Sequence, residues 1–367
     1  MKRILFTATV MEHIKAFHIP YINWLSQNGY KVDVACSGAE ELTNINKTYN
    51  ISITRSPYSF NNFKAFFELK KIISNNDYNL IHCHTPMGGV LTRIASLNAR
   101  KNKNTNVIYT AHGFHFFKGA PLINWLLYYP IEKILSNFTD VLITINKEDY
   151  QLAKENFKAN KIKYINGIGL DTEYFKETKV NKKQKISELK IPKKKRIILS
   201  IGELNKNKNH ESVIKAISKI DNDDFCYIVC GKGKLKNYLL NLIEELNLKD
   251  KVKLLGYRND INEILQISDI YIHPSFREGL PVSVMEAMAS GLPVIASKIR
   301  GNEDLIEDSE YLINPSNIEE IGFMIDDLLK KNEAILKKIG EYNKKRIKRY
   351  DLRNILKEMA EIYESNM

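Results

Sequence analysis

Short apolar runs alternate with longer segments in which apolar residues recur every three or four positions, and this pattern extends along nearly the whole chain. Such alternation predicts parallel β-sheets whose strands are joined by crossover helices. Two of the expected helices cover residues 14–27 and 122–136. The strands expected in the first half are residues 4–9, 32–36, 51–54, 80–84, 107–110, 141–145 and 162–164. Those expected in the second half are residues 197–201, 227–230, 252–254, 270–273, 294–296 and 311–313.

A polar, lysine-rich stretch at residues 176–195 separates the two series and carries no apolar period. We interpret it as a solvated linker with a surface helix. A chain of 367 residues is long for one hydrophobic core, so two domains are expected, at residues 1–175 and 196–350. Residues 351–367 are predicted to form a last helix, with one apolar face made by Leu352, Ile355, Leu356, Met359 and Ile362.

The composition is that of a globular protein, with 44% hydrophobic and 27% charged residues. No apolar run is long enough to span a bilayer, and no signal peptide is expected. The spacing of Cys36, Cys83, Cys226 and Cys230 is typical of neither a zinc site nor a disulfide framework, so reduced thiols and a cytoplasmic location are expected. The formal charge of +12 leaves three kinds of partner open: nucleic acid, an anionic membrane surface and anionic substrates.

The stretch from residue 270 to residue 296 carries the most specific pattern. After the strand at 270–273 come a Glu278-Gly279 loop, a helix with Pro281 in its first turn, and Gly291 as the left-handed residue that ends that helix. The unpaired amides at the start of such a helix bind phosphate. Glu286, more than one turn further on, could accept paired hydrogen bonds from a sugar diol. Phosphate next to a diol indicates a nucleotide.

This pattern resembles the donor-binding motif of family 4 glycosyltransferases, in a branch that makes exopolysaccharides and capsules. The resemblance implies a retaining enzyme with the α/β GT-B fold: two Rossmann-like, doubly wound parallel-sheet domains that face each other across a cleft. It further implies that the N-terminal domain binds the acceptor, that the C-terminal domain binds the nucleotide-sugar, and that the last helix packs back on the N-terminal domain. No cofactor and no metal are expected, and an internal-return mechanism is implied.

The resemblance also assigns residues of the second domain. Lys208, in the loop after the strand at 197–201, matches the lysine that clamps the donor diphosphate in relatives, whereas Glu203 stands where an arginine is usual. Arg258 matches a loop that touches the nucleobase; an ordinary surface turn is the alternative. The expected donor-binding residues are Gly202, Lys208, Arg258, Glu278, Gly279, Leu280, Pro281, Val282, Ser283 and Glu286.

In the first domain, His112 directly follows the strand at 107–110 and precedes Gly113, in a segment similar to the family's active-site loop. Together with Lys208 and Glu278, it completes the expected catalytic set. The loop after the first strand lacks the glycine pair of many relatives, so we expect Glu12 and His13, with His84, to meet the acceptor. The remaining histidines of the first domain are His18, His82 and His115. Lacking a carboxylate or cysteine at ligand spacing, the histidines are expected to line the cleft or join the core rather than bind zinc.

The resulting hypothesis is a retaining transferase that moves a sugar from a nucleotide-sugar to a glycan acceptor in surface polysaccharide biosynthesis. The expected donor is a UDP-sugar, and the expected acceptor is carried on polyprenyl diphosphate. Two alternatives are kept. A nucleotide-sugar epimerase can share this fold and would isomerise the donor without any acceptor. A basic nucleic-acid-binding protein would explain the charge, but no recognition motif or basic-aromatic groove is present, so no nucleic-acid partner is expected.

Aromatic residues crowd the segment after His112. If Ile123, Leu126 and Leu127 form the core stripe of the helix at 122–136, aromatics such as Phe117 and Trp125 remain to be explained. Aromatic side chains beside basic ones suit an anionic membrane surface, which predicts a peripheral position on the inner face of the cytoplasmic membrane. A well-packed helix that buries its aromatics is the alternative.

Overall fold

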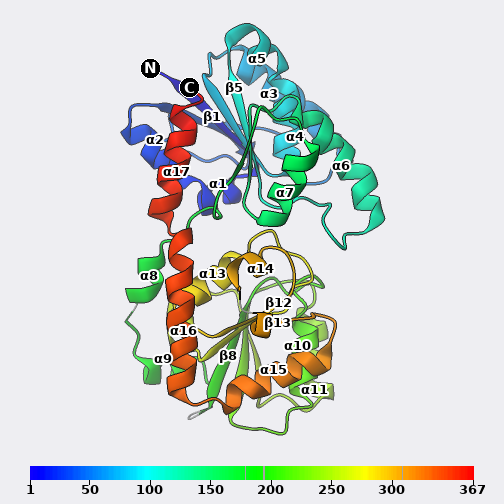
Figure 1. The fold of residues 1–367 in the computed structure, drawn as a ribbon, viewed down its shortest axis with the longest axis vertical. Helices are drawn as coiled ribbons and strands as arrows, with labels where there is room; N and C mark the ends of the chain where they lie inside the picture. The colour runs from blue at the N-terminus through cyan, green and yellow to red at the C-terminus, as the bar shows by residue number, and fades with distance from the viewer. Residues whose placement is uncertain (178, 193–194, 308) are drawn as a thin grey trace. The chain divides into compact units, whose positions relative to one another are not determined.

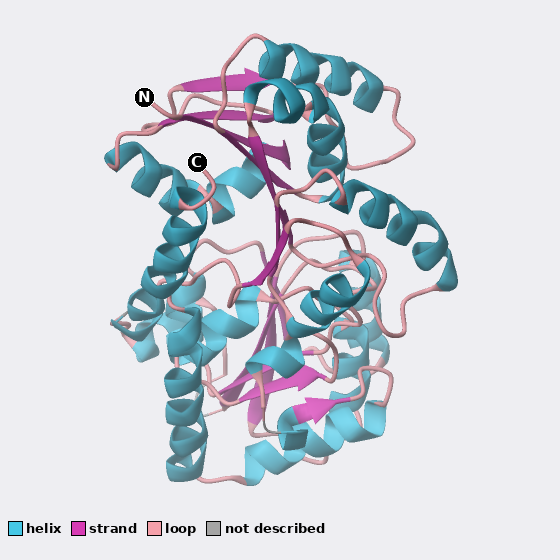
Figure 2. Ribbon diagram, turned by 45° about the horizontal axis from the view of Figure 1, so that its top comes forward, coloured by secondary structure: helices cyan, strands magenta, loops and turns pink. Residues whose placement is uncertain are grey.

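The computed structural model describes residues 1–177, 179–192, 195–307 and 309–367. It divides into two compact units (Figure 1). Unit 1 comprises Met1–Gly169 and Arg353–Met367, and unit 2 comprises Leu170–Leu352. In both units helices pack around a parallel sheet (Figure 2). No helix in the described residues combines the length and the apolarity needed to cross a membrane.

The described strands of unit 1 form one parallel sheet in the order β3-β2-β1-β4-β5-β6-β7. These strands are β1 (Arg3–Val10), β2 (Lys31–Ser37), β3 (Lys47–Asn50), β4 (Leu80–His84), β5 (Asn106–Ala111), β6 (Val141–Thr144) and β7 (Lys161–Tyr164). The helices are α1 (Met11–Phe17), α2 (Ile19–Gln27), α3 (Asn61–Ser74), α4 (Pro86–Ala95), α5 (Leu97–Lys103), α6 (Leu122–Ser136), α7 (Lys147–Asn156) and α17 (Leu352–Glu364), whose first residue belongs to unit 2.

Two expected elements of unit 1 are wrong. The strand predicted at 51–54 is not formed; Ile51 and Ile53 are buried, but the strand at this edge is the preceding β3, which is polar. The single helix predicted at 14–27 is broken at His18, because Pro20 lies in the first turn of a second helix.

The faces of α6 are also the reverse of the prediction. Ile123, Leu126 and Leu127 are exposed, whereas Trp125 packs against the core beside the buried Phe116. Phe114, Phe116, Trp125, Tyr128 and Tyr129 therefore belong to or pack against the core of unit 1, and aliphatic side chains form the outer face of α6. The alternative of a helix that buries its aromatics is correct for Trp125.

The described strands of unit 2 form a second parallel sheet in the order β10-β9-β8-β11-β12-β13. They are β8 (Arg196–Ile201), β9 (Phe225–Cys230), β10 (Val252–Gly256), β11 (Ile270–His273), β12 (Val294–Ser297) and β13 (Leu312–Ile313). The helices are α8 (Thr172–Glu177), α9 (Lys182–Glu188), α10 (His210–Ile217), α11 (Lys236–Glu245), α12 (Ile261–Ile267), α13 (Val282–Ala289), α14 (Asn302–Leu305), α15 (Ile318–Lys330) and α16 (Glu333–Ile347), with short 3₁₀ turns at Ser309–Tyr311 and Lys348–Tyr350.

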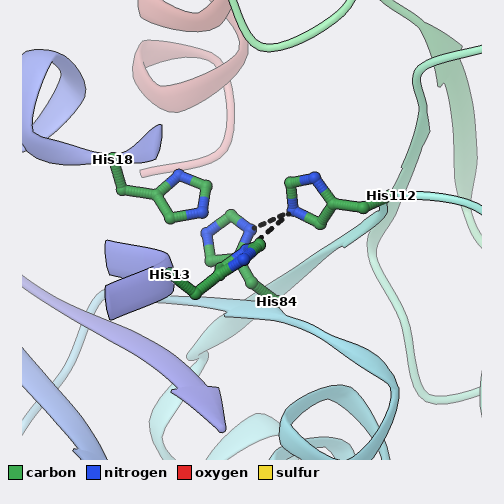
Figure 3. Close-up of side chains that lie close together, drawn as sticks. All are labelled: His13, His18, His84 and His112. Carbon is green, nitrogen blue, oxygen red and sulfur yellow. Dashed lines mark hydrogen bonds between the residues drawn. The ribbon is translucent and has the colours of Figure 1, made fainter. Parts of the chain in front are cut away.

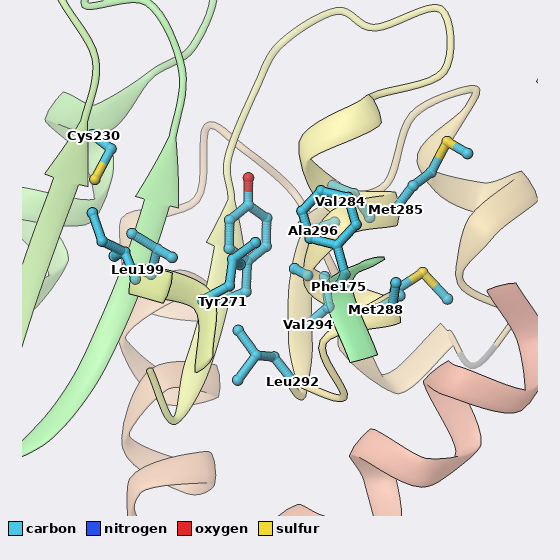
Figure 4. Close-up of a cluster of buried hydrophobic side chains, with 14 of the residues drawn as sticks. Phe175, Leu199, Cys230, Tyr271, Val284, Met285, Met288, Leu292, Val294 and Ala296 are labelled. Carbon is cyan, nitrogen blue, oxygen red and sulfur yellow. The ribbon is translucent and has the colours of Figure 1, made fainter. Parts of the chain in front are cut away.

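Helix α13 is fixed in place by the core of unit 2 (Figure 4). Val284, Met285 and Met288 are buried in the same cluster as Tyr271 of β11 and Val294 of β12. The helix ends as the sequence predicts: Gly291 has φ of 79°. Its amide donates to the carbonyl of Met288 and the next amide, of Leu292, donates to Ala287, which is the pattern of a Schellman motif.

The stretch interpreted as a solvated linker is largely part of unit 2. Leu189 and Ile191 are buried in the core cluster that contains Phe175. Lys185 is 8% exposed, with Nζ 2.7 Å from Asp260 and 2.6 Å from Glu263. The lysine-rich composition concealed this anchoring, because the buried apolar positions are few and irregularly spaced.

Helix α17 belongs to unit 1 through contacts that are far apart in sequence. Its buried face includes Ile355 and Met359, and the Tyr363 hydroxyl lies 2.9 Å from Nδ1 of His82 in β4. Asn106 donates a 2.8 Å hydrogen bond from its side chain to the carbonyl of Asn366. The end of the chain thus completes the fold of its first unit.

Candidate active site

In each sheet the strand order reverses direction at one place, where two neighbouring strands have connections that leave on opposite faces. In unit 2 this place lies between β8 and β11. Ligands of open parallel sheets bind at the carboxyl ends of such strands. The loops that leave these two ends carry Lys208 and Glu278, so the topology itself brings together two residues 70 positions apart.

Lys208 and Glu278 form an ion pair. Nζ of Lys208 lies 2.6 Å from Oε1 of Glu278, and the same oxygen lies 3.0 Å from Nε2 of His273. Burial on its own would raise the pKa of Glu278, but its interactions with His273 and Lys208 outweigh burial and lower the pKa to about 2. Burial lowers the pKa of His273. We therefore assign the positive charge to Lys208 and treat His273 as a neutral hydrogen-bond donor to Glu278.

The loops that carry this ion pair are joined by their own hydrogen bonds. The Phe276 amide donates to the Asn207 carbonyl (2.8 Å), and the Asn207 side chain donates to the Arg277 carbonyl (2.9 Å). Asn209 has φ of 54° and donates from its side chain to the carbonyl of Pro274 (3.1 Å). Asparagine tolerates this left-handed conformation better than most residues. The position of Lys208 is thus fixed on both sides.

A cavity of about 900 Å³ lies in unit 2, and Gly202, beside the side chain of Lys208, contributes to its wall. Glu286 of α13 contributes to its wall, and burial raises the pKa of this carboxyl to about 7. A carboxyl that titrates near neutrality can ionise when a ligand offers hydrogen-bond donors. The lining residues are Ile201, Gly202, Glu203, Cys230, Gly231, Lys232, Gly233, Lys234, Tyr257, Arg258, Ile261 and Glu286.

Glycines let the backbone close in around this cavity. A Cβ on Gly231 would lie 1.8 Å from the carbonyl oxygen of Gly202, and a Cβ on Gly202 would lie 3.2 Å from the Lys208 side chain. Only glycine fits at Gly231 without moving the backbone of the neighbouring strand end. Gly202 leaves Lys208 room to lie across the end of β8.

The N-terminus of α13 is close to the predicted arrangement. Pro281 is the N-cap, and the helix begins at Val282, one residue later than the sequence indicates. The N-cap makes no side-chain hydrogen bond, so it does not satisfy the first amides of the helix, among them those of Val282 and Ser283. Gly279 and Leu280 form the preceding turn against Gly301, where a Cβ would lie 2.2 Å from the Gly279 oxygen.

Arg258 does not stand free at the cavity wall. Its guanidinium forms ion pairs with Asp260 (2.6 Å) and Glu188 (2.9 Å), and the hydrogen bond to Asp260 raises its pKa. The neighbouring Tyr257 had not been predicted as a site residue. It is 69% exposed, and the Lys232 ammonium lies 5.3 Å from its ring centroid. Its place beside Arg258 in the loop after β10 was the available signal.

In unit 1 the strand order reverses between β1 and β4, and the predicted site residues gather there (Figure 3). His13 belongs to α1, directly after β1; His84 ends β4; His112 follows β5. Nε2 of His112 lies 3.3 Å from Nε2 of His13 and 3.4 Å from Nδ1 of His84. His18, which had been given no role, stacks on His84 with ring centroids 3.7 Å apart.

These imidazoles are neutral. Burial lowers the pKa of His13 to about 4 and holds the pKa values of His18, His84 and His112 well below the ordinary value. The adjacent His82 differs from these residues in its hydrogen bonds: both of its ring nitrogens have a partner, one in Thr110 and the other in Tyr363. Glu12 lies in the first turn of α1 with its side chain exposed.

Two protein families match the chain. Residues 3–146 match the family described as Glycosyl transferase 4-like, and residues 181–346 match the family described as Glycosyl transferases group 1. The first range contains the histidine group of unit 1, which consists of His13, His18, His84 and His112, and the second range contains the Lys208–Glu278 pair of unit 2.

Curated relatives cover most or all of the chain. The putative glycosyltransferase EpsD of Bacillus subtilis (strain 168) is 40% identical over 372 residues, which cover 100% of this chain and 97% of that protein. The UDP-Gal:alpha-D-GlcNAc-diphosphoundecaprenol alpha-1,3-galactosyltransferase of Escherichia coli is 29% identical, over 80% of this chain and 79% of that protein.

Solved structures share the fold at lower identity. The crystal structure of Anabaena Alr3699/HepE in complex with UDP and glucose has a TM-score of 0.81 at 21% identity and covers 100% of both chains. The crystal structure of WaaG, a glycosyltransferase involved in lipopolysaccharide biosynthesis, has a TM-score of 0.76 at 14% identity and covers 98% of this chain and 99% of that one.

Proposed function

The chain belongs to the family 4 glycosyltransferases of group 1 and is a glycosyltransferase of the GT-B fold, and from this premise we propose that it transfers a sugar from a UDP-sugar, with retention of configuration, to a lipid-linked glycan in the synthesis of a surface polysaccharide. The relative from Escherichia coli, whose name gives a UDP-sugar donor and a diphosphoundecaprenol-linked acceptor, supports the donor and acceptor classes. The structure solved with UDP and glucose supports the choice of nucleotide.

The observation that carries the proposal is the Lys208–Glu278 pair beside the cavity that Glu286 lines. An ammonium group has three donors, so Lys208 can keep Glu278 and still bind a diphosphate oxygen. The amides of Val282 and Ser283 add the positive end of a helix dipole. Together these groups favour the charge that builds up on a departing diphosphate.

The reaction breaks the bond between the anomeric carbon and the β-phosphate oxygen, whose electron pair leaves with UDP. The acceptor hydroxyl attacks the anomeric carbon from the face that the leaving group vacates, and its proton passes to the departing phosphate oxygen. Lys208 stabilises that oxygen, and Glu278, ionised beside it, holds Lys208 in position. His112 is assigned to the donor sugar and His13, His84 and Glu12 to the acceptor, as the family resemblance implies.

Nucleotide recognition falls to the cavity of unit 2. Glu286 accepts hydrogen bonds from the ribose diol, which draw its carboxyl into the ionised form. The Tyr257 ring is free on one side to stack on the base, whereas Arg258 is held by Asp260 and Glu188 and shapes the wall. Base-on-aromatic stacking of this kind contributes about 1–3 kcal/mol.

A lipid-linked acceptor requires contact with a membrane, and we assign this contact to α6. Leu122, Ile123 and Leu126 are 75%, 56% and 64% exposed, and Lys118 and Lys133 are exposed near them. An exposed aliphatic face with flanking lysines suits an anionic bilayer surface. The membrane contact is thus assigned to the aliphatic residues and not to Trp125, which packs against the core.

Vesicle flotation tests this assignment. Leu122→Ser with Leu126→Ser should reduce binding to anionic vesicles, and raising the salt concentration should weaken binding of the wild type. Phe323→Ser is the matched control, because Phe323 of unit 2 is 70% exposed but lies on another helix, α15. Equal binding by the double variant and the wild type would remove α6 from the membrane contact.

The transfer reaction itself is tested with a panel of UDP-sugars and a polyprenyl-diphosphate-linked sugar acceptor. We expect one donor to give an extended lipid-linked product whose new glycosidic bond, assigned by proton NMR, has the anomeric configuration of the donor. An inverted product would contradict retention. Isomerisation of a donor without any acceptor would instead support the epimerase alternative.

A further inference from the structure

Four histidines lie close together in unit 1: His13, His18, His84 and His112. One ligand atom from each of His13, His18, His84 and His112 can be chosen so that all lie within 4.8 Å of one another (Figure 3). Three chain segments supply them: the α1–α2 region, the end of β4 and the loop after β5. We propose that these four side chains form a binding site for a divalent transition-metal ion of the Zn²⁺ class.

The distances suit a metal better than a hydrogen-bond network. A hydrogen bond that involves a ring N–H is usually about 2.9–3.0 Å long. The measured separations from Nε2 of His112 are 3.3 Å to His13 and 3.4 Å to His84. Zn–N bonds of about 2.0–2.1 Å in a tetrahedron place neighbouring nitrogens about 3.3–3.4 Å apart. These two distances match the edge of that tetrahedron, and the other pairs of ligand atoms lie within 4.8 Å.

His18 lacks a hydrogen-bond partner. Both of its ring nitrogens are buried without one among the described residues. Buried polar atoms are normally satisfied, so the unpaired nitrogens of His18 indicate a missing partner. An imidazole nitrogen is a ligand that transition metals of the Zn²⁺ class accept readily.

His13 and His112 are only partly buried, whereas His18 and His84 are buried. A bound ion would link the first helices to the ends of β4 and β5. His112 is also assigned to the donor sugar, so binding of the ion and contact of Nε2 with the sugar exclude one another. The metal assay contains no donor, and its outcome is independent of the transfer assay.

The test uses the untagged full chain, because a polyhistidine tag would bind the metal itself. Zn²⁺ is titrated in competition with a chromophoric chelator, and Co²⁺ is used as a spectroscopic substitute. We expect one ion per chain and the intense visible bands of four-coordinate Co²⁺. His13→Ala and His112→Ala should each weaken Zn²⁺ binding by at least about tenfold, since even residues behind the ligands cost 10–100-fold.

The matched control is His115→Ala, which removes a histidine of the same loop whose ring packs on Tyr128 (4.8 Å between centroids), outside the group. It should bind Zn²⁺ like the wild type. Circular dichroism melts establish that each variant is folded, and the Co²⁺ spectrum of the wild type decides the matter even if a variant is not. Absence of stoichiometric binding, the weak spectrum of octahedral Co²⁺, or equal affinity in both ligand variants and the wild type would overturn the proposal.

Discussion

The two units place their functional residues at the same topological position, but these residues are charged in unit 2 and uncharged in unit 1. In unit 2 the ends of β8 and β11 carry an ion pair, Lys208–Glu278, and Glu278 has its pKa lowered to about 2. In unit 1 the ends of β1 and β4 carry buried imidazoles, and burial keeps His84 and His112 neutral. One sheet arrangement thus supports a charged half and an uncharged half.

The comparison shows which property belongs to the fold and which to the side chains. The strand order decides where a ligand binds. Whether the site is charged depends on its partners. Glu278 stays ionised because it interacts with His273 (3.0 Å) and with Lys208 (2.6 Å). The titratable groups around His84 are other imidazoles, which only lower its pKa further. A leaving diphosphate needs the charged half.

The largest effect is expected from removing the charge of unit 2. Lys208→Ala should lower kcat about 10²–10³-fold, the loss typical when one group that stabilises developing negative charge is removed. KM for the donor should change less, because the charge on the diphosphate grows towards the transition state. Steady-state kinetics with the donor identified by the transfer assay measure both constants.

Lys206→Ala is the matched control, a lysine of the same loop for which no contact to Glu278 is found among the described residues. It should retain wild-type kcat. If Lys208→Ala also kept its turnover number, the ion pair would be structural and would have no part in stabilising the leaving diphosphate.

A smaller loss is expected at the diol end of the cavity. Glu286→Gln should weaken UDP-sugar binding by about 10–150-fold, since a hydrogen bond to a charged acceptor contributes about 1.5–3 kcal/mol. Isothermal titration of the unreactive complex, without acceptor, measures the affinity. Glu203→Gln, on the same cavity wall, is the control. An unchanged affinity in Glu286→Gln would exclude Glu286 from ribose recognition.

The pH dependence of donor binding sharpens the comparison further. The pKa of Glu286 in the free protein is about 7, and binding favours its ionised form. Affinity for a UDP-sugar should therefore rise about tenfold as pH increases from 6 to 8, most of it below pH 7. In Glu286→Gln this rise should disappear. A pH-independent affinity in the wild type would mean that Glu286 does not change its charge on binding.

The last prediction concerns stability. The folded-state pKa of Glu286 exceeds the ordinary value of 4.5, so the folded protein binds the extra proton and loses stability as pH rises between that value and about 7. Above pH 7 the loss reaches about 3 kcal/mol. Glu286→Gln should thus raise the melting temperature of the ligand-free protein at pH 8, by about a few degrees, but not at pH 4. A variant that melts below the wild type at pH 8 would contradict this.

The sequence predicts the fold well where strands are apolar and continuous. Residues 270–296 form the expected strand, loop, helix and strand because buried β11 and β12 leave little choice of register. Prediction fails at edges and surfaces. Edge strand β3 is polar, so the pattern predicts a strand at the apolar Ile51 and Ile53 that follow it instead. On α6 both faces are apolar, so the pattern alone does not distinguish the exposed Leu126 from the packed Trp125.

Site residues are predicted individually but not as partners. Lys208, Glu278 and Glu286 follow from local motifs, yet the contact between Lys208 and Glu278 spans 70 residues and appears only when β8 and β11 pair. His18 has no motif at all. It joins His84 because Pro20 interrupts the helix expected at 14–27, and the resulting break positions the imidazole.

The most direct test of the account is donor binding itself, measured as thermal stabilisation by a panel of UDP-, GDP-, ADP- and CMP-sugars. We predict that UDP-sugars stabilise the wild type, by about 2.7 kcal/mol at a concentration 100 times the dissociation constant, and stabilise Glu286→Gln far less at the same concentration. If no nucleotide-sugar stabilised the wild type, or if wild type and variant responded equally, the assignment of unit 2 as the donor-binding half would be contradicted.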